Sequence, residues 1–217
     1  MQNISVVIFD LGRVLVHIDF DAFPNGLGLR TKAEREPYVN DKSIEKFAVK
    51  YETGKITTNE FLNTLEKIFQ GKFSREHILH TWNEIIGREN QAILPIVYDV
   101  QRKYRTAVLS NTSESHWKKA ISTAPVVRSF QQYFLSYEIG WMKPDPKIYD
   151  SVIESLRVPP GEILFIDDIQ ENIDAAVEKG MKGIVFTSAD QLRRDLKGMI
   201  SLPDRNDSEG KMKRSQK

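Results

Sequence analysis

Short apolar runs recur along the chain, and three of them end in a polar residue that can do chemistry. Residues 4–10, 106–110, 163–167 and 183–187 are each rich in Val, Ile, Leu and Phe and contain few polar positions. Continuous runs of this length predict strands of a parallel sheet that is buried on both faces. The first three runs end in Asp10, Ser110 and Asp167, so we expect these side chains at the carboxyl ends of strands.

Helical patterns separate the predicted strands. Asp145 and Pro146 fit an N-cap and a first-turn proline for a helix with apolar residues on one face as far as Leu156. A second helix is predicted over residues 171–179, ending at Gly180. This alternation predicts an α/β fold, a Rossmann-like parallel sheet core with helices on both faces. Ligands of such sheets bind beyond the carboxyl ends of the strands.

Residues 18–92 have a different, helical texture. Thr57 and Glu60 fit a capping box, and Ser74 fits the cap of a further helix that carries Trp82, Ile85 and Ile86. We therefore predict a small all-helical cap domain at 18–92, inserted into a core domain formed by 1–17 and 93–202 and covering the active edge of the sheet. The tail, residues 203–217, has one apolar residue, Met212, and is predicted to be disordered.

Composition narrows the function classes. Apolar residues make up 40% and charged residues 28% of the chain, as in globular proteins. The net charge of +1 gives no overall attraction for nucleic acid or an anionic membrane, so neither is expected as a partner. The absence of cysteine excludes disulfides, thiolate metal sites and cysteine nucleophiles. No apolar run near the start is long enough for a signal peptide or a membrane span, which favours a cytoplasmic protein.

The acidic residues that follow the strands indicate a metal site. Asp10, Asp167 and Asp168 would converge at one sheet edge. Carboxylates repel by about 4 kcal/mol per pair at about 4 Å in an effective dielectric of about 20. A divalent cation would remove this repulsion, and ligands that are all oxygen atoms indicate Mg²⁺. A helix cap or a solvated turn is the ordinary alternative role for each acid.

Four segments in chain order carry a resemblance to a known family. They are Phe9-Asp10-Leu11-Gly12-Arg13-Val14-Leu15, Leu109-Ser110-Asn111, Lys143-Pro144-Asp145-Pro146 and Phe165-Ile166-Asp167-Asp168. With them the chain resembles the haloacid dehalogenase-like superfamily, specifically its phosphatases with a helical cap inserted after the first strand. It is similar to the alpha-D-glucose-1-phosphate phosphatases within that group. The resemblance extends to about Ser201.

The resemblance implies a role for each matching residue. Asp10 would be the nucleophile, because a carboxylate can attack phosphorus and form an acyl phosphate that water later cleaves. Asp10 and Asp168 would bind Mg²⁺ directly together with the backbone carbonyl of Gly12. Asp167 would bind the ion through water or lie just behind the direct ligands. The phosphate would be held by three residues, namely Ser110, Asn111 and Lys143, of which Ser110 and Lys143 also count as catalytic. Asn172 is expected to fix the two adjacent acids.

Gly12 departs from the pattern of the family. Most phosphatases of the superfamily have at this position an aspartate that serves as general acid, a contribution of typically about 10²–10⁴-fold. A subgroup with Asp-Leu-Gly nevertheless hydrolyses phosphate esters, and the weakly basic anomeric oxygen of a sugar 1-phosphate needs a proton less. His17 and Asp19 are candidates to replace the acid, or plain turn residues. Arg13 is a candidate phosphate contact, or a cover for the sheet edge.

The sequence therefore predicts a Mg²⁺-dependent phosphatase that acts on a small phosphorylated metabolite, a sugar phosphate in particular. One alternative is a non-catalytic phosphate-binding member of the family, because Gly12 cannot act as an acid. A second is a haloacid dehalogenase, which needs no metal and which the Asp167-Asp168 pair argues against. A third is a phosphomutase, which relies on the missing acid in both directions. No pattern in the chain specifies an oligomeric state.

Overall fold

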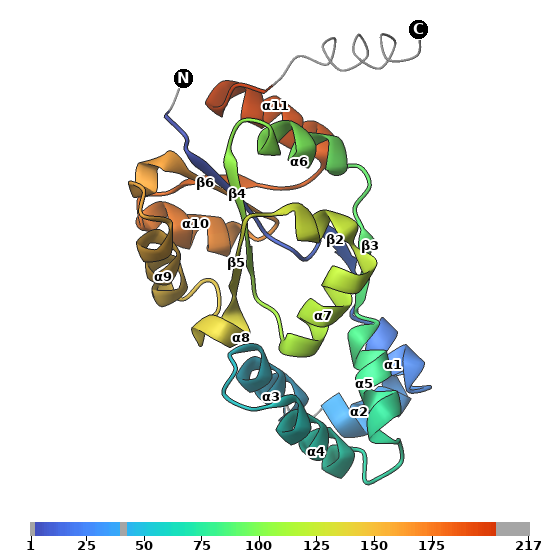
Figure 1. The fold of residues 1–217 in the computed structure, drawn as a ribbon. Coiled ribbons are helices and arrows are strands. Elements are labelled where there is room, and N and C mark those ends of the chain that lie inside the picture. The colour runs from blue at the N-terminus through green and yellow to red at the C-terminus, as the bar shows by residue number, and fades with distance from the viewer. Residues whose placement is uncertain (1–2, 40–42, 203–217) are drawn as a thin grey trace, which may run out of the picture.

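The computed structural model describes residues 3–39 and 43–202, so the predicted disordered tail at 203–217 lies outside the described residues (Figure 1). In chain order the elements are β1 (Val6–Phe9), β2 (Val16–Ile18), α1 (Ala22–Gly26), α2 (Lys32–Val39), α3 (Ser43–Glu52), α4 (Thr58–Ile68), α5 (Arg75–Asn83), β3 (Ile86–Glu89), α6 (Leu94–Gln101), β4 (Arg105–Ser110), α7 (Glu114–Thr123), η1 (Pro125–Ser129), β5 (Gln132–Leu135), α8 (Ser136–Ile139), α9 (Pro146–Leu156), η2 (Pro160–Glu162), β6 (Ile163–Asp167), α10 (Gln170–Glu178), β7 (Lys182–Val185) and α11 (Ala189–Met199).

The main sheet has five parallel strands in the order β5-β4-β1-β6-β7. This confirms the predicted α/β fold. β1 is central, and its last residue, Phe9, pairs with Val108 of β4 and Ile166 of β6. Because these three strands run in the same direction and in register, the residues that follow them meet at one edge of the sheet.

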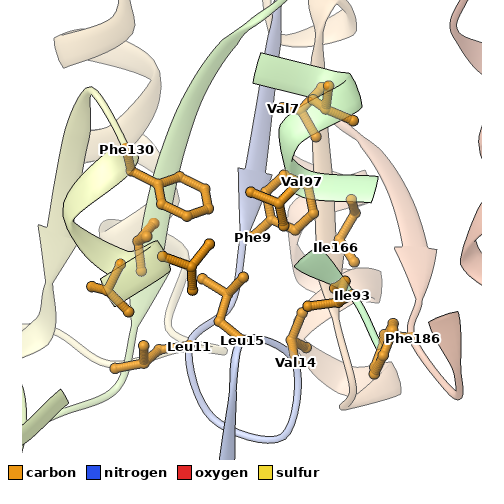
Figure 2. Packing of buried hydrophobic residues seen from close by; sticks show 14 of the residues in the cluster. Val7, Phe9, Leu11, Val14, Leu15, Ile93, Val97, Phe130, Ile166 and Phe186 are labelled. Carbon is orange, nitrogen blue, oxygen red and sulfur yellow. The ribbon is translucent and has the colours of Figure 1, made fainter. Parts of the chain in front are cut away.

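The two faces of the sheet bury alternate residues of β1. Val7 and Phe9 belong to a cluster with side chains of α6, α7 and α11, whereas Val6 and Ile8 belong to a cluster with side chains of α9 and α10. Figure 2 shows part of the first cluster, in which Phe9 packs edge-on against Phe130 with ring centroids 5.7 Å apart. Each side chain buried in this way contributes about 1.5–3 kcal/mol, so the sheet is a rigid support for its edge.

The predicted helix caps are present. The Asp145 carboxylate accepts a hydrogen bond from the Lys147 N–H at the start of α9. Thr57 and Glu60 form the reciprocal capping box of α4. The Ser74 hydroxyl accepts from the His77 N–H at the start of α5. Such caps stabilise a helix by about 1 kcal/mol each, which explains why these boundaries are readable in the sequence.

Helices α1–α5 form a separate layer beyond the carboxyl edge of the sheet, with a hydrophobic cluster of their own (Figure 1). Phe61 lies at the centre of this cluster, stacked on Tyr51 and tilted against Trp82. The helical cap is thus present, while the exact domain boundaries at 17/18 and 92/93 stay a prediction. Within the described part of the chain, no helix is both long and apolar enough to cross a bilayer.

One expectation for this segment is wrong. Ile85 and Ile86 were expected on the helix that begins after Ser74, but α5 ends at Asn83 and Ile86 begins β3. β3 pairs with β2 in a short antiparallel ribbon that joins the cap to the core. Gly87 allows a close approach of the two strands, since a Cβ at this position would lie 3.0 Å from the His17 carbonyl oxygen. Ile85 and Ile86 follow Trp82 at helical spacing, so the sequence pattern continues to predict a helix where this short strand begins.

Candidate active site

The strand ends place the predicted residues together. Asp10 directly follows β1 and is 7% exposed, and its N–H donates to the Ile166 carbonyl at 2.8 Å. Ser110 is the last residue of β4 and Asp167 the last residue of β6, and both are buried. The central strands therefore deliver these three side chains to one edge, as predicted from the apolar runs.

Lys143 lies between two of the acids. Its Nζ donates to Asp10 Oδ1 at 2.6 Å, to Asp167 Oδ2 at 2.6 Å and to the Leu109 carbonyl at 3.1 Å. An ammonium has three protons, so all of them are used. Burial alone would lower the pKa of Lys143, but the two carboxylates outweigh it and raise the pKa. Lys143 is thus a fixed, permanently charged group.

Asn111 positions Lys143. The Asn111 amide oxygen accepts from the Lys143 N–H, and its amide nitrogen donates to the Lys143 carbonyl, both at 2.8 Å. This reciprocal pair ties the end of β4 to the loop before α9. The Ser110 hydroxyl, in contrast, has only a long contact of 3.4 Å to the Asn111 carbonyl among the described residues. Contact of either residue with phosphate stays a prediction.

Asp167 is fully hydrogen bonded. Its carboxylate accepts from Lys143, from the Ile169 N–H at 2.8 Å and from Asn172 Nδ2 at 3.0 and 3.1 Å. The predicted contact of Asn172 with the two adjacent acids is therefore present for Asp167, and no such bond to Asp168 occurs among the described residues. The side chain of Asp167 is completely buried, and it holds the Lys143 ammonium in place from the side away from the solvent.

Three carboxylates converge, as a metal site requires. One oxygen atom from each of Asp10, Asp167 and Asp168 lies within 4.8 Å of the others. Burial raises the pKa of Asp10 to about 7, although the Lys143 ammonium opposes this. A hard divalent cation would favour the ionised form, and an all-oxygen donor set fits Mg²⁺. Arg13, which is 54% exposed in its side chain, lies 3.4 Å from Asp168 at the rim.

A cavity of about 440 Å³ separates this edge from the cap. Asp10, Ser110, Lys143 and Asp168 line it from the strand ends, and Gly12 and Asn111 lie beside them. The volume suits a small metabolite. The two candidates to replace an acid at Gly12 are elsewhere: His17 and Asp19 are exposed and do not line the cavity, and Asp19 accepts from the Asp21 N–H.

A comparison with known families decides the relationship. The model of the haloacid dehalogenase-like hydrolases matches residues 4–180. The chain belongs to this family. The resemblance inferred from the four segments is thereby confirmed.

The chain is similar to two phosphatases and to one solved enzyme structure of this family. It is 28% identical over 188 residues to a D-ribitol-5-phosphate phosphatase from Bacteroides thetaiotaomicron, a match that covers 82% of this chain and 90% of the relative. It is 26% identical to a phosphatase from Mycobacterium tuberculosis, covering 94% and 98% of the two chains. A solved haloacid dehalogenase family enzyme from B. thetaiotaomicron, in complex with magnesium and inorganic phosphate, has 28% identity and a TM-score of 0.75 and covers 85% and 95% of the two chains.

Two residues of the hydrolase cavity were missed from the sequence. Glu52, at the end of α3, lines the cavity from the cap, and burial raises the pKa of its carboxyl to about 7. His116 of α7 stacks on Trp82, and burial lowers its pKa to about 4, against the hydrogen bond to the Trp82 carbonyl. From the sequence alone, Glu52 resembles a surface acid before a Thr-Gly turn. His116 resembles any polar residue of an amphipathic helix. Only the packing of cap on core reveals either.

Proposed function

We propose that this hydrolase is a Mg²⁺-dependent phosphatase that acts on a small phosphate ester through an aspartyl-phosphate on Asp10. The observation that carries the proposal is the convergence of Asp10, Asp167 and Asp168 with Lys143 beside one cavity. Positioning and positive charge are most of what phosphoryl transfer requires. The phosphatases among its relatives, and the magnesium and phosphate bound to one of them, support the same chemistry.

The residues divide the work as follows. Lys143 holds one Asp10 oxygen and leaves the other for attack on phosphorus. Asp10, Asp168 and the Gly12 carbonyl would hold Mg²⁺, which supplies charge to the phosphate oxygens when bound. Asp167 would act through Lys143 and water, since its oxygens already accept four hydrogen bonds from three groups. Ser110 and the backbone of Asn111 would bind the transferred phosphate, and the charge of Lys143 would help to neutralise it.

A sugar or polyol phosphate is the substrate class we favour. The cavity holds about 440 Å³, which fits a five- or six-carbon phosphate better than a macromolecule. The relative that acts on D-ribitol 5-phosphate supports a polyhydroxy leaving group. No nucleic-acid or membrane partner enters the proposal.

The test is phosphate release from a panel of sugar, polyol and aryl phosphates with Mg²⁺. We expect turnover of at least one sugar or polyol phosphate, its loss with EDTA, and its loss in Asp10→Asn. Asp174→Asn, an exposed aspartate on α10, is the matched control and should retain full activity. Tight phosphate binding without turnover would favour the non-catalytic alternative. Chelator-resistant chloride release from a haloacid would favour the dehalogenase.

A further inference from the structure

An ordinary alkoxide leaving oxygen needs a proton from an acid, and no carboxyl or ammonium group at the strand ends has one that is free. Lys143 already donates all three of its protons, and the Asp167 carboxylate is saturated. Asp10 is the nucleophile of the proposed function, and Gly12 has no side chain. A proton donor for the leaving group must therefore come from another wall of the cavity.

Glu52 is the carboxyl group on the opposite wall. It lines the same cavity as Asp10 and Lys143, but it belongs to the cap. Its carboxylate makes no hydrogen bond and no ion pair with the residues at 3–39 and 43–202. A group with these properties is available to exchange a proton with a ligand in the cavity.

The chain holds Glu52 in place through its neighbours. We call residues 51–54 the docking segment. The Tyr51 hydroxyl accepts from the Ser115 N–H at 3.2 Å, and the Ser136 hydroxyl donates to the Glu52 carbonyl at 2.5 Å. Gly54 has a φ of +64°, and a Cβ there would lie 2.1 Å from the Tyr137 carbonyl oxygen. Three contacts with the core thus fix the backbone of Glu52 while its carboxyl stays unpaired.

His116 is the other titratable group on this side, and it is already engaged. Its Nε2 is 2.9 Å from the Trp82 carbonyl, and its ring stacks on the Trp82 indole at a centroid distance of 4.9 Å. It is 5% exposed. A ring held on both its face and its edge positions Trp82 and is not free to serve a substrate.

We propose that Glu52 is the general acid and base of the reaction, a role that rests on the proposed phosphatase function. In the first step an Asp10 oxygen bonds to phosphorus and the bond from phosphorus to the leaving oxygen breaks. The leaving oxygen keeps the electron pair and takes the proton of the Glu52 carboxyl, so an alcohol departs. In the second step the Glu52 carboxylate takes a proton from water, whose oxygen bonds to phosphorus. The bond to Asp10 then breaks, which releases phosphate and returns Glu52 to its acid form.

The same position would serve both steps, because water attacks phosphorus from the side that the alcohol left, opposite Asp10. Burial, the cause that raises the pKa of Glu52 to about 7, supports the role, since a donor and acceptor works best near the operating pH. The charged and titratable side chains that share the cavity are Asp10, Arg13, His116, Lys143 and Asp168. Beside the docking segment, Glu114 pairs with Lys118 and the Tyr137 hydroxyl donates to Glu138.

The test compares leaving groups in Glu52→Gln with Mg²⁺ bound. We expect kcat/KM to fall about 10²-fold or more for an alkyl phosphate, less for phenyl phosphate, and little for p-nitrophenyl phosphate, whose leaving group needs no proton. In the unmodified protein, kcat/KM for the alkyl phosphate should fall as pH rises through about 7, because the Glu52 carboxyl loses its proton. This fall should disappear in the variant. A burst of p-nitrophenolate should appear, because water attack on the aspartyl-phosphate is slowed. Glu45→Gln, an exposed glutamate on the same helix, is the control and should match the unmodified protein.

The outcomes separate this proposal from the phosphatase function. A retained kcat/KM for p-nitrophenyl phosphate in Glu52→Gln shows that the variant is folded. An equal loss of kcat/KM for all three esters, or no loss for any, would overturn the role of Glu52 and leave the phosphatase standing. No phosphate release by the unmodified protein from any ester would overturn both.

Discussion

The two walls of the cavity bury titratable groups in opposite ways. On the strand-end wall, Asp10 and Asp167 share the Lys143 ammonium at 2.6 Å each. On the cap-side wall, which includes Glu52 and Trp82 of the cap and His116 of α7, no opposite charge lies within ion-pair distance of Glu52 or His116 among the described residues. On the first wall the Lys143 ammonium opposes the effect of burial, although the pKa of Asp10 is still raised to about 7. On the second wall burial meets no opposing charge and favours the neutral forms of Glu52 and His116.

Each wall can therefore make a different contribution to the hydrolysis of a phosphate ester. Paired, fixed charges can hold a phosphate dianion and a divalent cation without having to reorganise. This is the requirement for stabilising charge in a transition state. Unpaired groups with shifted pKa values gain or lose protons easily. A cavity between the two walls can thus combine charge stabilisation with proton transfer, each from a different layer of the fold.

The largest expected effect comes from removing the charge of the strand-end wall. Lys143→Met leaves two buried carboxylates uncompensated, so the free energy of unfolding without metal should fall by about 3–5 kcal/mol. Added Mg²⁺ should restore part of it, and kcat/KM should fall about 10²–10³-fold. Thermal unfolding with and without Mg²⁺ checks this. Lys179→Met, which breaks an exposed pair with Asp150, should cost less than about 1 kcal/mol.

The next effect concerns the docking segment. Gly54→Ala places a methyl group against the Tyr137 carbonyl in a left-handed backbone conformation. Gly71 has a similar φ of +71° with open space around it, so Gly71→Ala measures the backbone cost alone, about 1 kcal/mol. We expect Gly54→Ala to cost about 1–3 kcal/mol more and to lower kcat, because Glu52 moves with the segment. Equal stability and activity of the two variants would show that this contact does not place Glu52.

A pH titration examines the neutral character of the cap-side wall. Burial lowers the pKa of His116 from 6.5 to about 4, so between these values the unfolded chain binds a proton that the folded protein does not. The stability that His116 contributes is therefore present above about pH 6.5 and is lost as pH falls. Relative to His116→Gln, the unmodified protein should lose about 2 kcal/mol between about pH 7 and pH 5. Chemical denaturation at several pH values measures the difference, and a constant gap would refute the assignment.

The smallest effect is expected for Arg13, the exposed cation at the rim of the strand-end wall. Arg13 pairs with Asp168 at 3.4 Å, but 54% of its side chain is exposed. Arg13→Gln should change the free energy of unfolding by less than about 1 kcal/mol. A loss as large as that of Lys143→Met would mean that the rim charge, too, is part of the buried network.

The sequence was sufficient where local signals are strong. Asp10, Ser110 and Asp167 follow uninterrupted apolar runs, so their meeting at one edge follows from a parallel sheet. The caps at Asp145 and Thr57 are fixed by side chains three residues or fewer from the backbone groups they bond. These features depend on contacts within one element or between neighbouring strands.

Other features depend on packing between distant segments. β3 is only four residues long and is stabilised by pairing with β2, some seventy residues earlier in the chain. β5 was not predicted, because Gln132-Tyr133-Phe134-Leu135 is short and follows no turn signal that separates it from its neighbours. Glu52 and His116 acquire their shifted pKa values only when cap and core enclose them.

The β2–β3 ribbon has a mechanical consequence. Both peptide connections between the cap and the sheet pass through these two paired strands, while α3 lies on the other side of the cap, beside α8 (Figure 1). A hinge at the ribbon would therefore displace the docking segment further than any residue near the hinge. Admission of a substrate by such a motion would break the three contacts of that segment together with the contact of His116 with Trp82 and the ion pair of Lys119 with Glu84. Their re-formation would return Glu52 to the cavity at the moment when bulk solvent is shut out.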